Sequence, residues 1–144
     1  MTLSINRSAL VMHSSERMHA LINDIAAYPE FLPWCSSASI LEKEESFMLA
    51  SLEVSKGGVK QSFTTRNDLS EDGRILMSLV EGPFAHLKGV WDFTMLQENA
   101  CKVALNLEFE MARNITKMAF GAIFNQAANT MVDAFCVRAD QVYG

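Results

Sequence analysis

The spacing of hydrophobic residues changes twice along the chain, and each change predicts a change of secondary structure. Residues 4–12 end in the apolar run ALVM and predict a first strand. A helix follows, because apolar residues recur at helical spacing at Met18, Leu21, Ile22 and Ile25. We expect Ser14 or Ser15 to cap this helix and the helix to end before Pro29, because a residue that precedes proline avoids the helical conformation. A short second helical turn is expected over residues 30–32.

Between residues 37 and 111 the hydrophobic period becomes two, which is typical of strands with one buried and one wetted face. Turn-forming segments divide this region into six short antiparallel strands. The turn-forming segments are Lys56-Gly57-Gly58, Glu71-Asp72-Gly73, Gly82-Pro83 and Gln97-Glu98-Asn99. The clearest strand carries on one face Val103, Leu105, Leu107, Phe109 and Met111. With the first strand, the pattern predicts seven strands.

From residue 115 to residue 142 the period returns to that of a helix and continues without a break. One side of this helix is apolar and carries Phe120, Phe124, Ala127, Ala128, Met131, Phe135 and Val142. The other side is polar and carries Asn125, Gln126, Asn129, Thr130, Asp133 and Asp140. A polar stripe of that length argues against a membrane span, because lipid would surround it.

This order of elements predicts an α+β fold, in which a curved seven-stranded antiparallel sheet holds a long C-terminal helix. The chain has 144 residues, 49% of them hydrophobic, so we expect a single domain over residues 1–144 with one core. A sheet curled around one helix leaves room for an internal hollow. Periodicity identifies the apolar faces but does not say whether the space between them is filled.

The charge balance argues against a DNA partner, because the net charge is -5. The lysines are scattered singly, so a basic surface for RNA would have to be assembled by the fold. The three cysteines are widely separated and residues 1–7 are polar, unlike a secretory signal, so we expect a reducing cytoplasm. The cysteines and the three histidines share no metal-ligand spacing, so no metal site is expected.

The segment YPEFLPWC, at residues 28–35, is unusually apolar for a loop, and two prolines stiffen it. It either plugs the core or presents an apolar surface at the mouth of a hollow, and both alternatives remain open. In the second case Phe31, Leu32 and Trp34 would contact a ligand and, transiently, a membrane. Cys35 is expected to be a packed thiol, because no base or cation accompanies it.

Large apolar residues from the inward faces of the sheet and the long helix would line any hollow. The candidates are Phe63, Trp91, Phe93, Leu105, Leu107, Phe109, Phe120, Phe124 and Met131. The nine methionines suit an adaptable lining, and they fill ordinary cores equally well. Gln61, Thr65 and Asn67 alternate in step with inward apolar residues. They either offer hydrogen bonds to the headgroup of a ligand or belong to an edge strand that is wet on both faces.

Few residues suggest enzyme chemistry. His86 follows the Gly82-Pro83-Phe84 turn and is the candidate base of a cyclase. Arg138 falls on the apolar side of the long helix, where it either meets a carboxylate, Asp92 or Glu108, or extends to water. The sequence has no triad order, no paired inward carboxylates and no phosphate-binding glycine loop, so we predict a protein that is not an enzyme, with no catalytic residue and no catalytic cofactor.

Three motifs carry a resemblance to a known family. They are YPEFLPWC at residues 28–35, GPFAHLKGVWDF at residues 82–93 and MVDAFCVRADQVYG at residues 131–144. With the order of elements, they make the chain resemble the START-like, helix-grip proteins of the coenzyme Q-binding and ribosome association toxin (RatA) group. Relatives of that group are also labelled polyketide cyclases or dehydrases.

The resemblance implies a fold that encloses an apolar tunnel for a hydrophobic isoprenoid lipid. Our first expectation is therefore a protein that binds or chaperones a ubiquinone-like lipid and supports respiration, in the cytoplasm or peripherally at the inner membrane. The alternative is a ribosome association toxin that binds a ribosomal subunit and blocks subunit joining. A polyketide cyclase or aromatase is the third function, and fold likeness alone does not transfer its chemistry.

Overall fold

The computed structural model of the chain describes residues 2–113 and 115–144. In chain order the elements are β1 (Leu3–Val11), α1 (Ser15–Asn23), the 3₁₀ helix η1 (Ile25–Glu30), β2 (Cys35–Lys43), β3 (Phe47–Lys56), β4 (Val59–Asp68), β5 (Arg74–Glu81), β6 (Phe84–Gln97), β7 (Ala100–Met111) and α2 (Ile115–Tyr143). The strands form one antiparallel sheet in the order β1-β7-β6-β5-β4-β3-β2. The predicted α+β fold, with its seven-stranded sheet and C-terminal helix, is confirmed.

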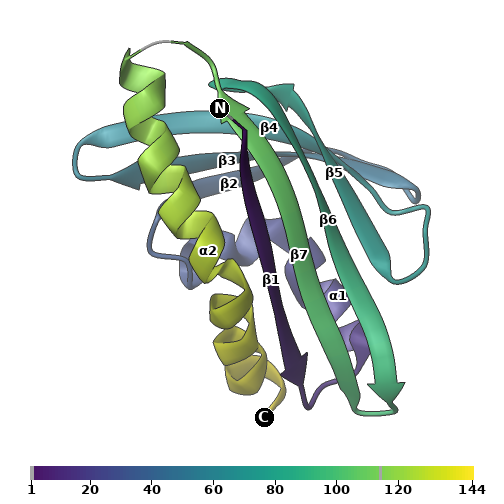
Figure 1. The fold of residues 1–144 in the computed structure, drawn as a ribbon. Coiled ribbons are helices and arrows are strands. Elements are labelled where there is room, and N and C mark those ends of the chain that lie inside the picture. The colour runs from purple at the N-terminus through teal and green to yellow at the C-terminus, as the bar shows by residue number, and fades with distance from the viewer. Residues whose placement is uncertain (1, 114) are drawn as a thin grey trace.

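The sheet is strongly curved. In Figure 1, β1, β7 and β6 run along the length of α2, whereas β4, β3 and β2 cross behind it. α2 packs against β1, β7 and β4, and α1 packs against β6 and β7. The space between α2 and the inner face of the sheet is therefore closed at one end by α1 and η1.

The turns follow the predicted breakers. Gly57 and Gly58 form a two-residue turn between β3 and β4, and both have positive φ angles, of 57° and 85°. These angles suit the turn type that matches the twist of antiparallel strands, and glycine adopts them without steric cost. Residues 71–73, 82–83 and 98–99 likewise fall between strands.

The first helix is shorter than predicted. The Ser14 side chain caps it by accepting a hydrogen bond from the Arg17 backbone N–H at 3.2 Å, as expected. The helix ends at Asn23, before Pro29 as predicted, and the second helical turn is η1, so the predicted bounds of that turn, residues 30–32, were wrong. The buried Tyr28 hydroxyl donates to the Ile22 carbonyl, a helix-end acceptor that would otherwise be unpaired.

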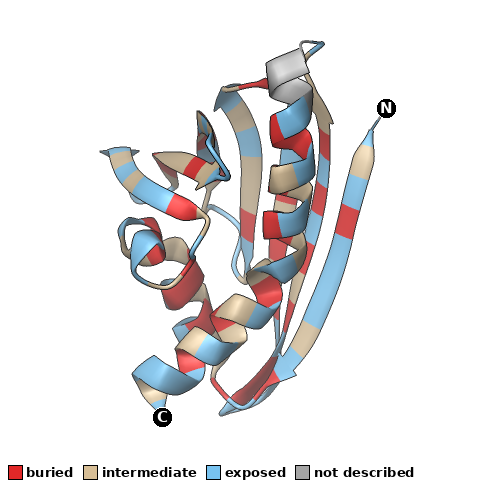
Figure 2. Cartoon of the chain, turned by 90° about the vertical axis from the view of Figure 1, so that its left-hand side faces the viewer, coloured by how far each residue is buried: buried red, intermediate tan, exposed pale blue. Residues whose placement is uncertain are grey.

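Two groups of aromatic rings join α2 to the sheet. Phe124 is the centre of the first group, with ring centroids 4.8–5.9 Å away in Phe63, Phe84, Phe109 and Phe120. Phe135 is the centre of the second, with centroids 5.2–5.6 Å away in Tyr28, Phe31 and Trp91. Figure 2 shows the buried residues as bands along α2 and the strands behind it, whereas β1 is mostly exposed.

The apolar side of α2 is buried as predicted, except at Met131, which is partly exposed, and at the last turn. Val142 is 50% exposed, although we placed it on the apolar side. The last turn contacts the rest of the protein through Tyr143, whose hydroxyl donates to the Arg17 carbonyl at 3.1 Å. Adjacent residues of a helix point about 100° apart, so Val142 faces water. None of the helices in the described part of the chain has the length and apolarity that a membrane span requires.

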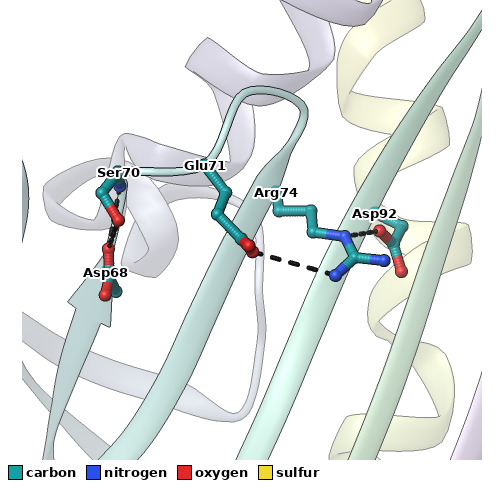
Figure 3. A network of polar contacts seen from close by, with 5 residues as sticks. All are labelled: Asp68, Ser70, Glu71, Arg74 and Asp92. Carbon is teal, nitrogen blue, oxygen red and sulfur yellow. Dashed lines mark hydrogen bonds and ion pairs between the residues drawn. The ribbon is translucent and has the colours of Figure 1, made fainter.

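A polar network fixes the β4–β5 turn to β6, as Figure 3 shows. Asp68 accepts hydrogen bonds from the Ser70 hydroxyl at 2.6 Å and the Ser70 backbone N–H at 2.8 Å, and these bonds lower the pKa of Asp68. The Arg74 Nε donates to Asp92 at 2.7 Å, and its Nη1 lies 3.8 Å from Glu71. All of these groups are solvated, so the network positions the turn more than it adds stability.

We expect alanine substitutions at two glycines to destabilise the protein to different degrees. A Cβ at Gly82 would lie 2.6 Å from the Cβ of Phe63, whose position the strand fixes, so Gly82→Ala is expected to cost about 1–3 kcal/mol. A Cβ at Gly89 would meet the ends of the Leu107 and Met77 side chains at 2.7 and 2.9 Å, and these ends can move. Urea denaturation of both variants checks the order, and a Gly89→Ala cost equal to that of Gly82→Ala would contradict it.

Candidate functional site

An apolar cavity lies between the inner face of the sheet, α2 and the α1–η1 end. Its lining includes seven of the residues predicted from the sequence, namely Trp34, Phe63, Trp91, Leu105, Leu107, Phe124 and Met131. Other apolar residues complete it, among them Ile22, Ile25, Tyr28, Ala50, Leu52, Ile75, Met77, Leu87, Ala127 and Ala128. Five lining residues are partly exposed, so the cavity opens among them, and they are Asn23, Trp34, Leu52, Met77 and Met131.

The cavity is small in this conformation. The volume that protein atoms leave empty is about 740 Å³, and this figure includes space that is open to solvent. The cavity volume within which the centre of a water molecule fits is only about 60 Å³. A water molecule needs about 10–15 Å³ on this scale, and an apolar cavity of about 150 Å³ admits benzene. The cavity therefore has room for a few water molecules, and a quinone with its tail would enter only after side chains move.

Six predicted residues lie outside the cavity lining, and they are Phe31, Leu32, Gln61, Phe93, Phe109 and Phe120. Phe109 and Phe120 pack against Phe84 at one end of the core, with centroids 6.1 Å from it. Phe93 packs against His19 at the other end, at 5.3 Å. These rings have the inward orientation that the pattern predicted, but they lie beyond the two ends of the cavity.

The segment at residues 28–35 combines the two alternatives that the sequence left open. Leu32 is 1% exposed and fills the core, as a plug would. Phe31 packs edge-on against Phe135 at 5.5 Å. Trp34 instead lines the cavity and keeps part of its surface in solvent, as expected at a mouth. The segment is therefore a plug over most of its length, and its tryptophan borders the opening.

Arg138 connects α2 to this segment. Its Nη2 lies 3.0 Å from the Glu30 Oε1, and its guanidinium carbon lies 4.9 Å from the centre of the Phe31 ring. The predicted partners were wrong, because Asp92 pairs with Arg74 and Glu108 with Lys88 across adjacent strands. The Arg138 Nε is buried without a hydrogen-bond partner. The ion pair with Glu30 and the contact with the Phe31 ring are the interactions that offset the burial of the guanidinium.

Three polar side chains line the otherwise apolar cavity. Thr65 and Asn67 on β4 are 7% and 4% exposed, and the Thr65 hydroxyl donates to the Asn67 Oδ1 at 2.9 Å. Asn23, which we did not predict, also lines the cavity, and its Oδ1 is buried without a partner. The edge-strand alternative was wrong, because β4 pairs with both β3 and β5. Gln61 is half-exposed, since the β4–β5 pairing begins only at Thr64.

The titratable groups near the cavity favour their neutral forms. Burial raises the pKa of the Tyr28 hydroxyl above its usual range, and it raises the pKa of the Cys35 thiol to about 11. Cys35 is therefore a protonated, packed thiol at neutral pH. His86, the candidate cyclase base, is exposed and does not line the cavity. Within residues 2–113 and 115–144, no cluster of His, Cys, Asp or Glu has the arrangement of a metal site.

A second candidate site lies on the outside of α2, where two cations from other strands contact its amides. The Arg7 Nε of β1 donates to the Asn129 Oδ1 at 3.2 Å, and the Lys56 Nζ of β3 donates to the Gln126 Oε1 at 3.1 Å. We define the α2 surface as Arg7 and Lys56 together with Asn125, Gln126, Asn129 and Thr130. The sequence has no Asp or Glu between Glu110 and Asp133, so the first half of α2 carries no negative side chain.

Four other cations of the described chain lie close to a carboxylate. Carboxylates lie within 4.0 Å of Lys60, Arg74, Lys88 and Arg138, whereas the partners of Arg7 and Lys56 are neutral amides. The fold thus places two cations that are far apart in the sequence against the same helix, each hydrogen-bonded to a neutral amide. Exposed amides beside positive charge are hydrogen-bonding groups suited to phosphate-rich partners.

Comparison with known proteins gives one family match and several relatives. The family described as polyketide cyclase / dehydrase and lipid transport matches residues 11–136. The ribosome association toxin RatA of Vibrio cholerae is 54% identical over 140 residues, which cover 97% of each chain. The protein of the same name from Pseudomonas aeruginosa is 51% identical over 144 residues and 100% of both chains.

A more distant relative and a solved structure have different names. The mitochondrial coenzyme Q-binding protein COQ10 of Dictyostelium discoideum is 26% identical over 132 residues, covering 89% of this chain and 64% of that protein. The Zhui aromatase/cyclase from Streptomyces sp. R1128 superposes with a TM-score of 0.86, covering 100% of this chain and 97% of that one, at 16% identity. At that identity the superposition shows the fold alone.

Proposed function

Because the chain belongs to the polyketide cyclase / dehydrase and lipid transport family, and within it to the ribosome association toxin RatA group, we propose that it binds a ribosomal subunit and hinders subunit joining. The observation that carries this proposal is the end-to-end identity with proteins named for ribosome association. This reverses the order of our expectations from the sequence, which ranked lipid binding first. The proposal implies action in the cytoplasm.

The α2 surface supports the proposal, because it removes the objection raised by the net charge of -5. Overall repulsion from RNA matters less where exposed cations flank a helix whose first half carries no Asp or Glu, since screening limits charge effects to about 8–10 Å at physiological salt. Arg7 and Lys56 are exposed on either side of the amides of α2 and are free to meet phosphates. We therefore assign the contact with ribosomal RNA to the α2 surface.

Sedimentation tests this function directly. Purified protein is added to separated ribosomal subunits under ionic conditions that allow them to join, and the mixture is resolved on a sucrose gradient. The proposal predicts that free subunits accumulate as protein is added and that the protein migrates with one of them. Profiles that stay unchanged at several salt concentrations would remove the support for a ribosomal role.

A second function is proposed on a separate observation, which is the apolar cavity and its partly exposed opening. We propose that the cavity binds a hydrophobic ligand, and the distant similarity to a coenzyme Q-binding protein makes an isoprenoid quinone the ligand class to test first. Binding would require the lining to expand, and Met77 and Met131 have the flexible side chains for it. Proteins with this function contact membranes transiently when they load a lipid.

Native mass spectrometry before and after delipidation tests the second function. A bound isoprenoid lipid, or the uptake of added ubiquinone, is the expected result. No bound mass and no uptake would contradict it. A cyclase is not proposed, because the cavity lining contributes the neutral Tyr28 hydroxyl and amides, and the candidate base His86 lies outside it.

A further inference from the structure

The polar groups of the cavity constrain what it can bind. Only 4% of Asn67 is exposed, and its Oδ1 already accepts a hydrogen bond from the Thr65 hydroxyl. With the Thr65 hydroxyl as the donor in this bond, the Asn67 Nδ2 keeps its hydrogens for another partner. Within residues 2–113 and 115–144 no acceptor lies at hydrogen-bond distance from it, so Asn67 offers the cavity a donor.

Asn23 offers the opposite group. It is the last residue of α1, it lines the same cavity, and its Oδ1 is buried without a partner. A buried acceptor left unpaired is unfavourable, because it has lost its hydrogen bonds to water. A ligand that donates a hydrogen bond to this oxygen would replace one of those lost bonds. A purely apolar ligand, or a ligand with acceptors alone, would not.

The remaining lining is apolar and aromatic, with Trp34, Trp91 and Tyr28 among its residues. We propose that the cavity selects a compact hydroxylated aromatic ring. A hydroxyl of the ligand donates to the Asn23 Oδ1, and an oxygen attached to the ring accepts from the Asn67 Nδ2. This inference rests on the second proposed function, that the cavity binds a ligand once its lining has expanded. It is independent of the ribosomal proposal.

The inference has a consequence for the redox form of a quinone-type ligand. An oxidised quinone carries acceptors only, so it satisfies Asn67 and leaves the Asn23 Oδ1 unpaired. The reduced ring carries hydroxyl donors and acceptors together, so it satisfies both groups. The cavity is therefore expected to hold the reduced form more tightly than the oxidised form.

The test measures binding of matched rings to the purified full-length protein by NMR titration. The first pair is p-cresol and toluene, which differ by one hydroxyl, and the second is durohydroquinone and duroquinone, compared under anaerobic conditions. We expect the hydroxylated member of each pair to bind about fivefold more tightly, since one hydrogen bond contributes about 1 kcal/mol and 1.4 kcal/mol is a factor of ten. Shifts at the Trp34 and Trp91 indoles locate the binding.

Two variants connect the preference to the named groups. Asn23→Leu is expected to bring the p-cresol to toluene ratio close to one, whereas Asn106→Leu, an exposed asparagine on the outer face of β7, leaves it unchanged. Equal binding of both members of each pair by the wild-type protein would overturn the inference and leave the second proposed function intact. If no ring binds at the cavity, both fail, and the groups then serve buried water.

Discussion

Phe135→Ala is expected to produce the largest loss of stability, about 3–5 kcal/mol. The Phe135 side chain is fully buried, and its ring meets the rings of Tyr28, Phe31 and Trp91 edge-on. The substitution removes this packing and leaves a void where α2, η1 and β6 converge. Because domains of this size are stable by about 5–15 kcal/mol, roughly a fifth or more of the total would be lost.

Chemical denaturation followed by circular dichroism measures this loss. Phe47→Ala is the matched control, because Phe47 is only partly buried and its recorded ring contact is the Arg66 guanidinium, 3.8 Å from the ring centre. The control should cost distinctly less. Equal costs for the two substitutions would show that Phe135 does not join α2 to the rest of the core.

The second large effect concerns ribosome binding. We expect the double variant Arg7→Glu/Lys56→Glu to bind isolated ribosomal subunits at least about tenfold more weakly than the wild-type protein, because each reversed charge replaces a phosphate attraction with a repulsion. Both side chains are exposed, and each makes one hydrogen bond to an exposed or half-exposed amide. The fold should therefore tolerate the change.

The control for this variant is Lys88→Glu/Lys102→Glu. It alters the net charge equally, but both lysines point outward from the sheet, on β6 and β7, away from α2. A general charge effect would weaken both double variants alike, and that result would refute the assignment of the contact to the α2 surface. Circular dichroism and thermal melting confirm that both variants are folded.

The strands and helices were predictable because their signals are local. The alternation over residues 103–111 and the helical spacing after residue 115 each depend on neighbours a few positions away. The early start of η1 was missed, because Ile25 continues the helical spacing of α1 in the sequence and the hydrogen bond from Tyr28 to the Ile22 carbonyl depends on the folded chain.

The cavity was predictable in part. Periodicity placed Trp91, Leu105 and Phe124 on inward faces, and they line it, but the same pattern selected Phe93 and Phe109, which lie beyond its ends. The pattern defines a face and not a position along it. The sequence did not indicate that Asn23 lines the cavity, because asparagine is common at helix ends. Its place in the lining depends on how α1 packs over the sheet.

The α2 surface was not predictable from the sequence. Arg7 and Lys56 belong to strands that are far apart in the chain, and they meet the same helix only because the curved sheet brings β1 and β3 to opposite sides of it. The partner of Arg138 was missed for the same reason, because Glu30 reaches it through the packing of η1 on α2.

The most direct test of the account is the affinity of the wild-type protein for isolated ribosomal subunits, measured over a series of salt concentrations. We predict binding whose logarithm falls linearly with the logarithm of salt concentration, as expected when cations on the α2 surface displace counterions from RNA. Absent binding, or an affinity that salt does not change, would contradict the account.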